Sequence, residues 1–285
     1  MAAKLFRFVQ VEVPWPLGPE DGRYVVRRHA GEQPDHVLVL KTLGASERRH
    51  KRGKRDRKAE PEPEPTPVST GRATIIAATP LESDDEAARW LSGVDREAEV
   101  TAALLVLNRA LHANRVSVAD PHAREVGRDD ALVIRLGYGA GEQVAEGRWT
   151  EAVELGYERR RRIKRTAALR PQERVAALLS GRDAALACEL LVLRTRADLD
   201  AGRQREAALQ LRASLDALLA ELPAWSERGD LAERIGELEG EHDAVAAVAE
   251  IALQRGLDPE ESAEVERVLR RAEAALRART AAGFV

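Results

Sequence analysis

Hydrophobic and polar residues alternate near the start of the chain, which predicts a β-strand. Valines alternate with Gln and Glu over residues 9–13, as in a strand with one buried face. A proline-rich segment at 14–19 ends this strand. Runs rich in β-branched and apolar residues predict three further strands, at 24–27, 36–43 and 72–78. We therefore expect a small antiparallel β unit within residues 1–82.

From about residue 83 the hydrophobic period becomes helical. Ser83 and Glu86 have the spacing of a capping box at a helix start. Asp258, Pro259 and Glu261 mark the start of the last helix in the same way. A break that contains glycine is expected near residue 240. The helices after the first are expected near 95–115, 129–145, 149–163, 171–200, 204–222, 230–255 and 259–281.

The predicted fold class is therefore α+β, with a small N-terminal antiparallel β unit (1–82) followed by a larger all-α domain of helical hairpins (83–285). A hydrophobic content of 44% is enough for a core, and an aromatic content of 4% leaves most of the packing to Ala, Leu and Val. The single cysteine, Cys188, lies in an apolar helical run. We expect a buried thiol and no disulfide within the chain.

Neither the N-terminal residues nor the apolar runs of the chain predict a membrane partner. No apolar run approaches the roughly 20 residues that span a bilayer, and the N-terminus lacks the apolar core of a signal peptide. The net charge of −3 does not indicate a class of partner. We expect a cytoplasmic protein.

The strongest charge feature is the segment 46–70, in which Arg and Lys are followed by Glu-Pro repeats. Such a composition buries too little apolar surface to offset the entropy of ordering, so we expect a disordered excursion from the β unit. A flexible polycation binds phosphates by releasing counterions, which makes nucleic acid a candidate partner; a solvated linker is the alternative. A second basic run at 159–165 would add to this surface or form an exposed helix end. The candidate phosphate-binding residues are Arg48, Arg49, Lys51, Arg52, Lys54, Arg55, Arg57 and Lys58.

The six-residue frame Gly-Arg-x-x-Glu-Ala occurs twice, at 147–152 and 202–207, between stretches of helical pattern. It resembles the turn between the two helices of tetratricopeptide repeats, in which a small residue ends the turn and an Ala packs in the second helix. The matching positions are Gly147, Trp149, Ala152, Gly202 and Ala207. The resemblance implies stacked helical hairpins that bind peptides or partner proteins. An ordinary helical bundle whose turns contain Gly is the alternative.

Other residue groups complete no recognisable chemical site. Gly137, Gly139 and Gly141 have the wrong spacing for a nucleotide-binding loop, so we interpret them as positions of close helix packing. Glu239 and His242 would share a helix face, but a di-iron site needs a second such pair and two further Glu residues. A loose group around one turn matches no metal spacing: His112, Asp120, His122 and Glu125.

We therefore assign no catalytic residue, metal or cofactor from the sequence. The favoured hypothesis is a non-enzymatic protein-interaction or scaffold protein that uses stacked helical hairpins to bind an unidentified protein or peptide. The alternative is a nucleic-acid-associated protein that binds phosphates through 48–58 and 159–165. An enzyme without a recognisable motif also stays open.

Overall fold

The chain forms two compact units, Met1–Arg159 and Arg160–Val285. The computed structural model describes residues 4–27, 31–44, 69–156, 165–227 and 229–281. The eight basic residues of 48–58, nearly all of the segment expected to be disordered, and residues 159–164 therefore lie outside the described residues. The α+β class is confirmed, with an antiparallel sheet in the N-terminal unit and a larger helical part in the chain as a whole.

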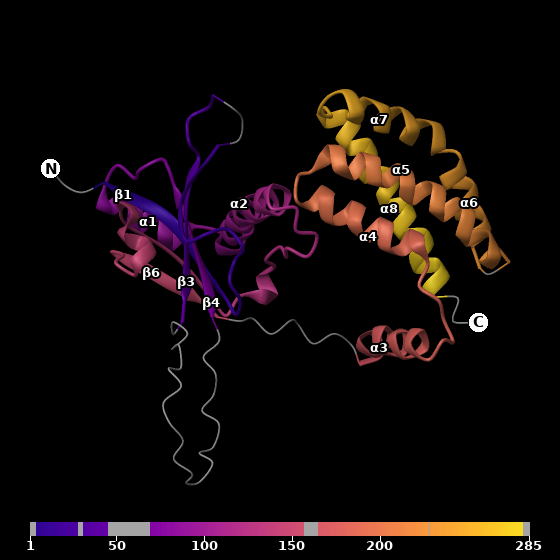
Figure 1. The fold of residues 1–285 in the computed structure, drawn as a ribbon, viewed down its shortest axis with the longest axis horizontal. Helices are drawn as coiled ribbons and strands as arrows, with labels where there is room; N and C mark the ends of the chain where they lie inside the picture. The colour runs from indigo at the N-terminus through magenta and orange to yellow at the C-terminus, as the bar shows by residue number, and fades with distance from the viewer. Residues whose placement is uncertain (1–3, 28–30, 45–68, 157–164, 228, 282–285) are drawn as a thin grey trace, which may run out of the picture. The chain divides into compact units, whose positions relative to one another are not determined.

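The first unit, which we call the sheet unit, is built on a six-stranded antiparallel sheet in the order β2-β3-β4-β1-β5-β6 (Figure 1). Strand β1 lies in the interior of the sheet, hydrogen-bonded to β4 on one side and to β5 on the other. The strands are β1 (Leu5–Val13), β2 (Gly22–Val26), β3 (His36–Leu43), β4 (Thr70–Ala77), β5 (Val133–Ala140) and β6 (Glu151–Leu155).

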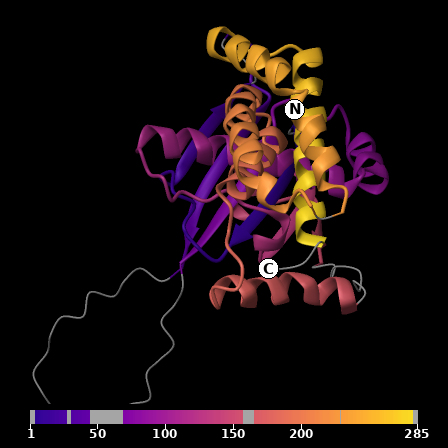
Figure 2. The same ribbon diagram turned by 90° about the vertical axis from the view of Figure 1, so that its right-hand side faces the viewer.

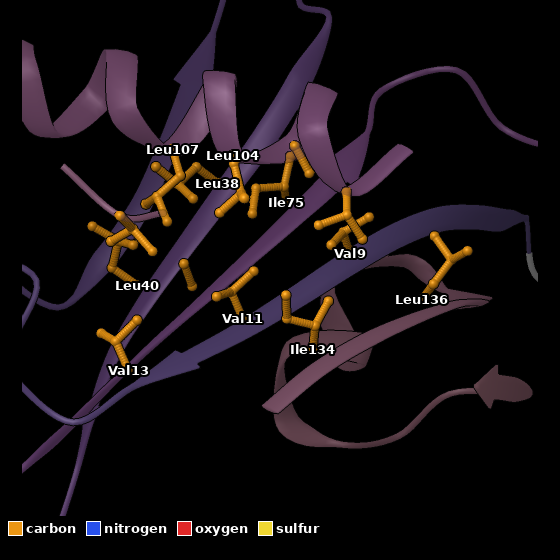
Figure 3. Packing of buried hydrophobic residues seen from close by; sticks show 14 of the residues in the cluster. Val9, Val11, Val13, Leu38, Leu40, Ile75, Leu104, Leu107, Ile134 and Leu136 are labelled. Atoms are coloured by element: carbon orange, nitrogen blue, oxygen red, sulfur yellow. The ribbon is translucent and has the colours of Figure 1, made fainter. Parts of the chain in front are cut away.

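Two helices, α1 (Asp84–Gly93) and α2 (Arg96–Ser117), supply the other half of the main core of this unit. Alternate residues of β1 point to the helix-covered face, so Val9 lies in the same buried cluster as Leu104 and Leu107 of α2 (Figure 3). The remaining labelled members of this cluster are Val11, Val13, Leu38, Leu40, Ile75, Ile134 and Leu136.

The opposite face of the sheet carries a smaller apolar cluster. Phe8, Ile76 and Val144 are buried there, and the Trp149 ring stacks on Phe8 with 5.8 Å between ring centroids. Val144 belongs to the 3-10 helix η2 (Gly141–Glu146), which follows β5. The sheet unit thus buries apolar side chains on both faces of β1.

The helices expected near 129–145 and 149–163 are wrong. The described part of this region forms a 3-10 helix, η1 (Arg128–Asp130), then strand β5, helix η2 and strand β6. Apolar period alone does not separate a short buried strand from a helix segment, and pairing with β1 favours the strand. Gly137 and Gly139 do allow close packing, but between neighbouring strands and the β5–β6 connection instead of between helices.

The predicted domain division after residue 82 is also wrong. Strand β5 returns to β1 after both helices, and Leu91 of α1 and Leu107 of α2 lie in the core of the sheet unit. The unit therefore extends to Arg159. Strand pairing between distant segments sets this boundary, and a change of local period at residue 83 does not reveal it.

The second unit, which we call the helical unit, contains long helices that pack around α5 and α8. In Figure 2 the yellow helix α8 runs beside the orange helices, and it contacts α4, α5 and α6. The break predicted near 240 is confirmed, and the expected helix 171–200 is interrupted at 180–186. The elements are α3 (Arg165–Leu179), α4 (Ala187–Asp200), α5 (Gln204–Glu221), η3 (Leu222–Trp225), α6 (Leu231–Glu239), α7 (His242–Gln254) and α8 (Pro259–Ala281).

Both predicted helix starts are confirmed by their hydrogen bonds. At α1, the Glu86 backbone N–H donates to Ser83 Oγ at 3.2 Å. At α8, the Glu261 N–H donates to the Asp258 carboxylate, and the Asp258 N–H donates to the Glu261 carboxylate, both at 2.9 Å. These bonds satisfy amides that a helix start leaves without an intrahelical partner.

Gly137→Ala is expected to lower the free energy of unfolding by about 1–3 kcal/mol, because the added methyl group overpacks the β5–β6 contact. An added Cβ would lie 2.2 Å from the Glu151 carbonyl oxygen and 2.7 Å from Ala152 Cα. Gly93→Ala is the matched control, since nothing lies within 4 Å of its Cβ position. Urea unfolding followed by circular dichroism measures both variants. Equal stability of the two would contradict the close strand approach.

Candidate functional site

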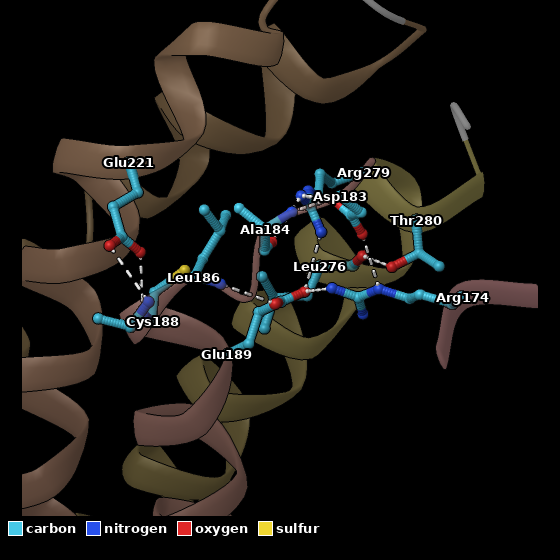
Figure 4. A network of polar contacts seen from close by, with 11 residues as sticks. Arg174, Asp183, Ala184, Leu186, Cys188, Glu189, Glu221, Leu276, Arg279 and Thr280 are labelled. Carbon is cyan, nitrogen blue, oxygen red and sulfur yellow. Dashed lines mark hydrogen bonds and ion pairs between the residues drawn. The ribbon is translucent and has the colours of Figure 1, made fainter. Parts of the chain in front are cut away.

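A buried arginine joins three helices of the helical unit (Figure 4). Arg279, near the end of α8, is 4% exposed and donates to Asp183 Oδ1 at 2.8 Å and to Glu189 Oε1 at 3.1 Å. Arg174 of α3 pairs with the same two carboxylates, and its Nε lies 3.2 Å from Asp183 Oδ2. The Arg279 guanidinium also lies 4.8 Å from the ring centroid of Trp225. This cluster ties α3, the start of α4 and the end of α8 together.

At Asp183, hydrogen bonds and nearby positive charge affect the pKa of the carboxyl more strongly than burial does. Burial alone raises the pKa of this carboxyl, but hydrogen bonds from Arg174 and the Ala184 N–H, with the charge of Arg279, lower its pKa below the usual 3.8. Asp183 is therefore ionised at neutral pH. The cluster is an ion-pair network whose stability depends on every partner being present.

The cysteine of α4 has a structural place beside this cluster. The Glu221 carboxylate accepts hydrogen bonds from the backbone N–H groups of Ala187 and Cys188, at 3.2 and 3.0 Å, and so caps α4. Burial, with the Glu221 carboxylate as the next cause, raises the pKa of the Cys188 thiol to about 12. The expectation of a buried thiol is confirmed, and a protonated thiol of this kind is a poor nucleophile.

A cleft of about 820 Å³ lies among α3, α4 and α8, next to the ion-pair network. Val192, Leu193 and Leu276 make part of its wall apolar. Leu193 is 66% exposed, and Leu190, three residues earlier on α4, is 52% exposed. Single exposed leucines are common on protein surfaces, whereas here an exposed leucine of the cleft has a second exposed leucine three residues away on the same helix.

Charges of both signs line the same cleft. Glu273 already has a partner, since its Oε1 lies 2.8 Å from Arg196 Nε of α4. Glu173 of α3 and Arg277 of α8 have no hydrogen-bond or ion-pair partner among the described residues. Among the residues that the structure describes, the lining of the cleft therefore combines an apolar wall with an unpaired anion, Glu173, and an unpaired cation, Arg277.

The structure separates the two copies of the Gly-Arg-x-x-Glu-Ala frame. Gly202 has φ +72° in the turn between α4 and α5, and Ala207 is fully buried, so this copy does lie at a helical hairpin. The first copy belongs to the sheet unit, where Gly147 ends η2 with φ +83°. Trp149 and Ala152 pack on the sheet, so their predicted helix–helix contact is wrong. The six-residue frame alone does not determine whether helices or strands flank it.

The other candidate residues from the sequence do not form a metal site in the described part of the chain. His242 Nε2 lies 3.0 Å from Asp216 Oδ1, an exposed pair on neighbouring helices. Asp120 accepts a hydrogen bond from the His122 backbone N–H at 2.9 Å, which is a local turn contact. Within the described residues, no three His, Cys, Asp or Glu side chains converge well enough to bind a metal ion.

Comparison with known proteins adds no family to this geometry. The chain matches no protein-family model, no curated protein and no solved structure. Of the helices in the described ranges, none combines the length and the apolar character needed to cross a membrane. The cleft and its charges are therefore the main evidence on function.

Arg279→Met is expected to lower the free energy of unfolding by about 3–5 kcal/mol at neutral pH, because it leaves buried carboxylates with fewer partners. The lowered pKa of Asp183 contributes stability that is present above pH 3.8 and is lost as the pH falls through the folded-state pKa. The difference in the free energy of unfolding between parent and variant should therefore become smaller at acidic pH. Denaturant unfolding at stepwise lower pH measures this.

Arg270→Met is the control for that variant. Arg270 is 65% exposed and its Nε lies 3.6 Å from Glu266 Oε1, so its loss should change the free energy of unfolding by no more than about 1 kcal/mol. A pH-independent difference for Arg279→Met would contradict the role given to Asp183.

Proposed function

We propose that this protein is a non-enzymatic binding protein whose helical unit binds an amphipathic helix of a partner protein in the cleft among α3, α4 and α8. The observation that supports this most is the exposed pair Leu190 and Leu193 beside the apolar wall. Residues three apart on a helix share one face, so the two leucines extend the apolar surface along α4.

The chemistry of the cleft suits a helix better than a small polar ligand. An amphipathic helix presents apolar side chains three and four residues apart, which fill an apolar groove and leave its polar face in water. The free charges of Glu173 and Arg277 would pair with opposite charges of the partner and set its direction.

The walls of the cleft are stiffly joined, which favours binding. Arg196 of α4 donates to Glu273 at 2.8 Å and to Glu266 at 3.1 Å, both on α8. Arg279 joins the same two helices at the other end of α4. A surface that is already ordered loses less conformational entropy when a partner binds. The α4–α5 hairpin at Gly202 is the part that we relate to tetratricopeptide-like hairpins.

A photoreactive amino acid at position 193 of the full chain is expected to crosslink a specific partner in extracts of the source cells, because this side chain lines the cleft. Position 253 on α7 is the matched control, since Leu193 and Leu253 are both 66% exposed and only Leu193 lines the cleft. Mass spectrometry identifies the crosslinked protein and its segment.

The identified segment, made as a peptide, is then expected to bind the parent protein and to lose about 2 kcal/mol of binding free energy with Leu193→Glu, as central apolar contacts do. Leu253→Glu should bind like the parent. Equal crosslinking at positions 193 and 253, or a peptide that binds Leu193→Glu unchanged, would contradict the proposal.

Nucleic-acid binding is the second proposal, and the topology of the sheet unit supports it. Leu43 of β3 and Leu155 of β6 lie at the same end of the sheet, where β1 finishes at Val13. The basic runs at 48–58 and 159–165 follow these two strand ends closely in the sequence. Each run carries several positive charges in sequence, which favours phosphate contact.

If the run at 48–58 binds nucleic acid, the log–log slope of duplex affinity against salt should be roughly −4 to −7, because the favourable free energy comes from released counterions. Replacing its eight basic residues by Ser should remove binding and leave the melting temperature unchanged. Fluorescence anisotropy with labelled duplex and single strands measures affinity across salt concentrations. Absence of binding at the lowest salt would contradict this second proposal. Binding that survives the replacement would assign the site to 159–165 or to another surface of the protein.

A further inference from the structure

An arginine of the sheet unit lies beneath the helices without a counter-ion. Arg7 is on the helix-covered face of β1, opposite Tyr138 of β5. Its guanidinium carbon lies 5.8 Å from the ring centroid of Trp90 on α1. Its Nε is buried without a hydrogen-bond partner, and no carboxylate among the described residues pairs with it. A half-buried cation in this state costs free energy unless a group of opposite charge pairs with it.

A cavity of about 240 Å³ adjoins Arg7. Its lining from the sheet includes the apolar residues Val9, Ile75 and Leu136 and the polar residue His36, and α2 lines it from the helix layer. Glu99 of α2 also lines this cavity and has no hydrogen-bond or ion-pair partner for its carboxylate among the described residues. One cavity with both apolar and polar lining thus contains a cation and an anion that do not pair with each other.

We propose that this cavity binds a small zwitterionic α-amino acid. Arg7 binds the carboxylate, because the paired N–H groups of a guanidinium match two carboxylate oxygens. Glu99 binds the ammonium group, and the aliphatic side chain packs on the apolar lining. A simple anion would pair Arg7 but be repelled by Glu99, and a simple cation would have the converse difficulty.

The volume agrees with a ligand of this size. The cavity of about 240 Å³ has room for roughly eight water molecules at about 30 Å³ each. A small aliphatic amino acid such as valine fits such a space. The Trp90 ring faces the Arg7 guanidinium in a cation–π contact, which favours the orientation of this side chain.

The test uses isothermal titration of the full chain with glycine, alanine and valine, and with two valine analogues. One analogue, 3-methylbutanoate, lacks the ammonium group, and the other, isobutylamine, lacks the carboxylate. Valine is expected to bind about tenfold or more tightly than either analogue, since each analogue forfeits a hydrogen-bonded ion pair. Arg7→Gln and Glu99→Gln should each weaken valine binding by a similar factor.

Arg96→Gln is the matched control, because Arg96 is exposed on the same helix as Glu99 and does not line the cavity. It should leave valine binding unchanged. If Arg7→Gln does not fold, as judged by circular dichroism, Glu99→Gln on α2 carries the test alone. Three results would overturn the proposal: no saturable binding of any of the three amino acids, equal binding of valine and 3-methylbutanoate, or unchanged valine binding by Glu99→Gln.

Discussion

Burial of the Arg279 guanidinium constrains the whole helical unit. A charge so far from water is tolerated only beside matched partners, so Asp183 and Glu189 must converge on it. That convergence sets the path of the chain between α3 and α4, and it brings the start of α4 to the end of α8. The cleft that we propose as a partner site is bounded by these same helices. The Arg279 network therefore helps to set the shape of the cleft, together with the ion pairs of Arg196.

The sheet unit depends on a different constraint, the need of β1 for hydrogen-bonded partners on both edges. β4 supplies one edge, and β5, which follows α1 and α2 in the chain, supplies the other. The glycines of β5 then allow the β5–β6 connection to pack closely, since a Cβ at Gly139 would lie 2.9 Å from Trp149 Cα. The helices, and not a second sheet, cover the face on which Arg7 and its cavity lie.

The two proposed ligand sites share one physical feature, a charge without a partner next to apolar surface. Elsewhere charges are often satisfied internally, as where Arg196 pairs with two glutamates of α8. In the helical unit the free charges border an open cleft, which suits a partner protein. In the sheet unit Arg7 and Glu99 border a small cavity, which suits a small zwitterion. The volume of each recess separates the two ligand classes.

Local signals in the sequence determined the helix starts at Ser83 and Asp258, the break near 240 and the hairpin turn at Gly202, because caps and turns depend on residues a few positions apart. The same kind of signal failed at 147–152, where tertiary pairing of β5 with β1 turned an equivalent six-residue frame into part of a sheet.

The apolar residues of the cleft lie on helices that the sequence predicted, but the sequence did not predict that these helices would meet. No local pattern in the sequence indicates that Arg7 and Glu99 line one cavity. They belong to a strand and a helix far apart in the chain, and only the packing of α2 on the sheet decided that they line one cavity.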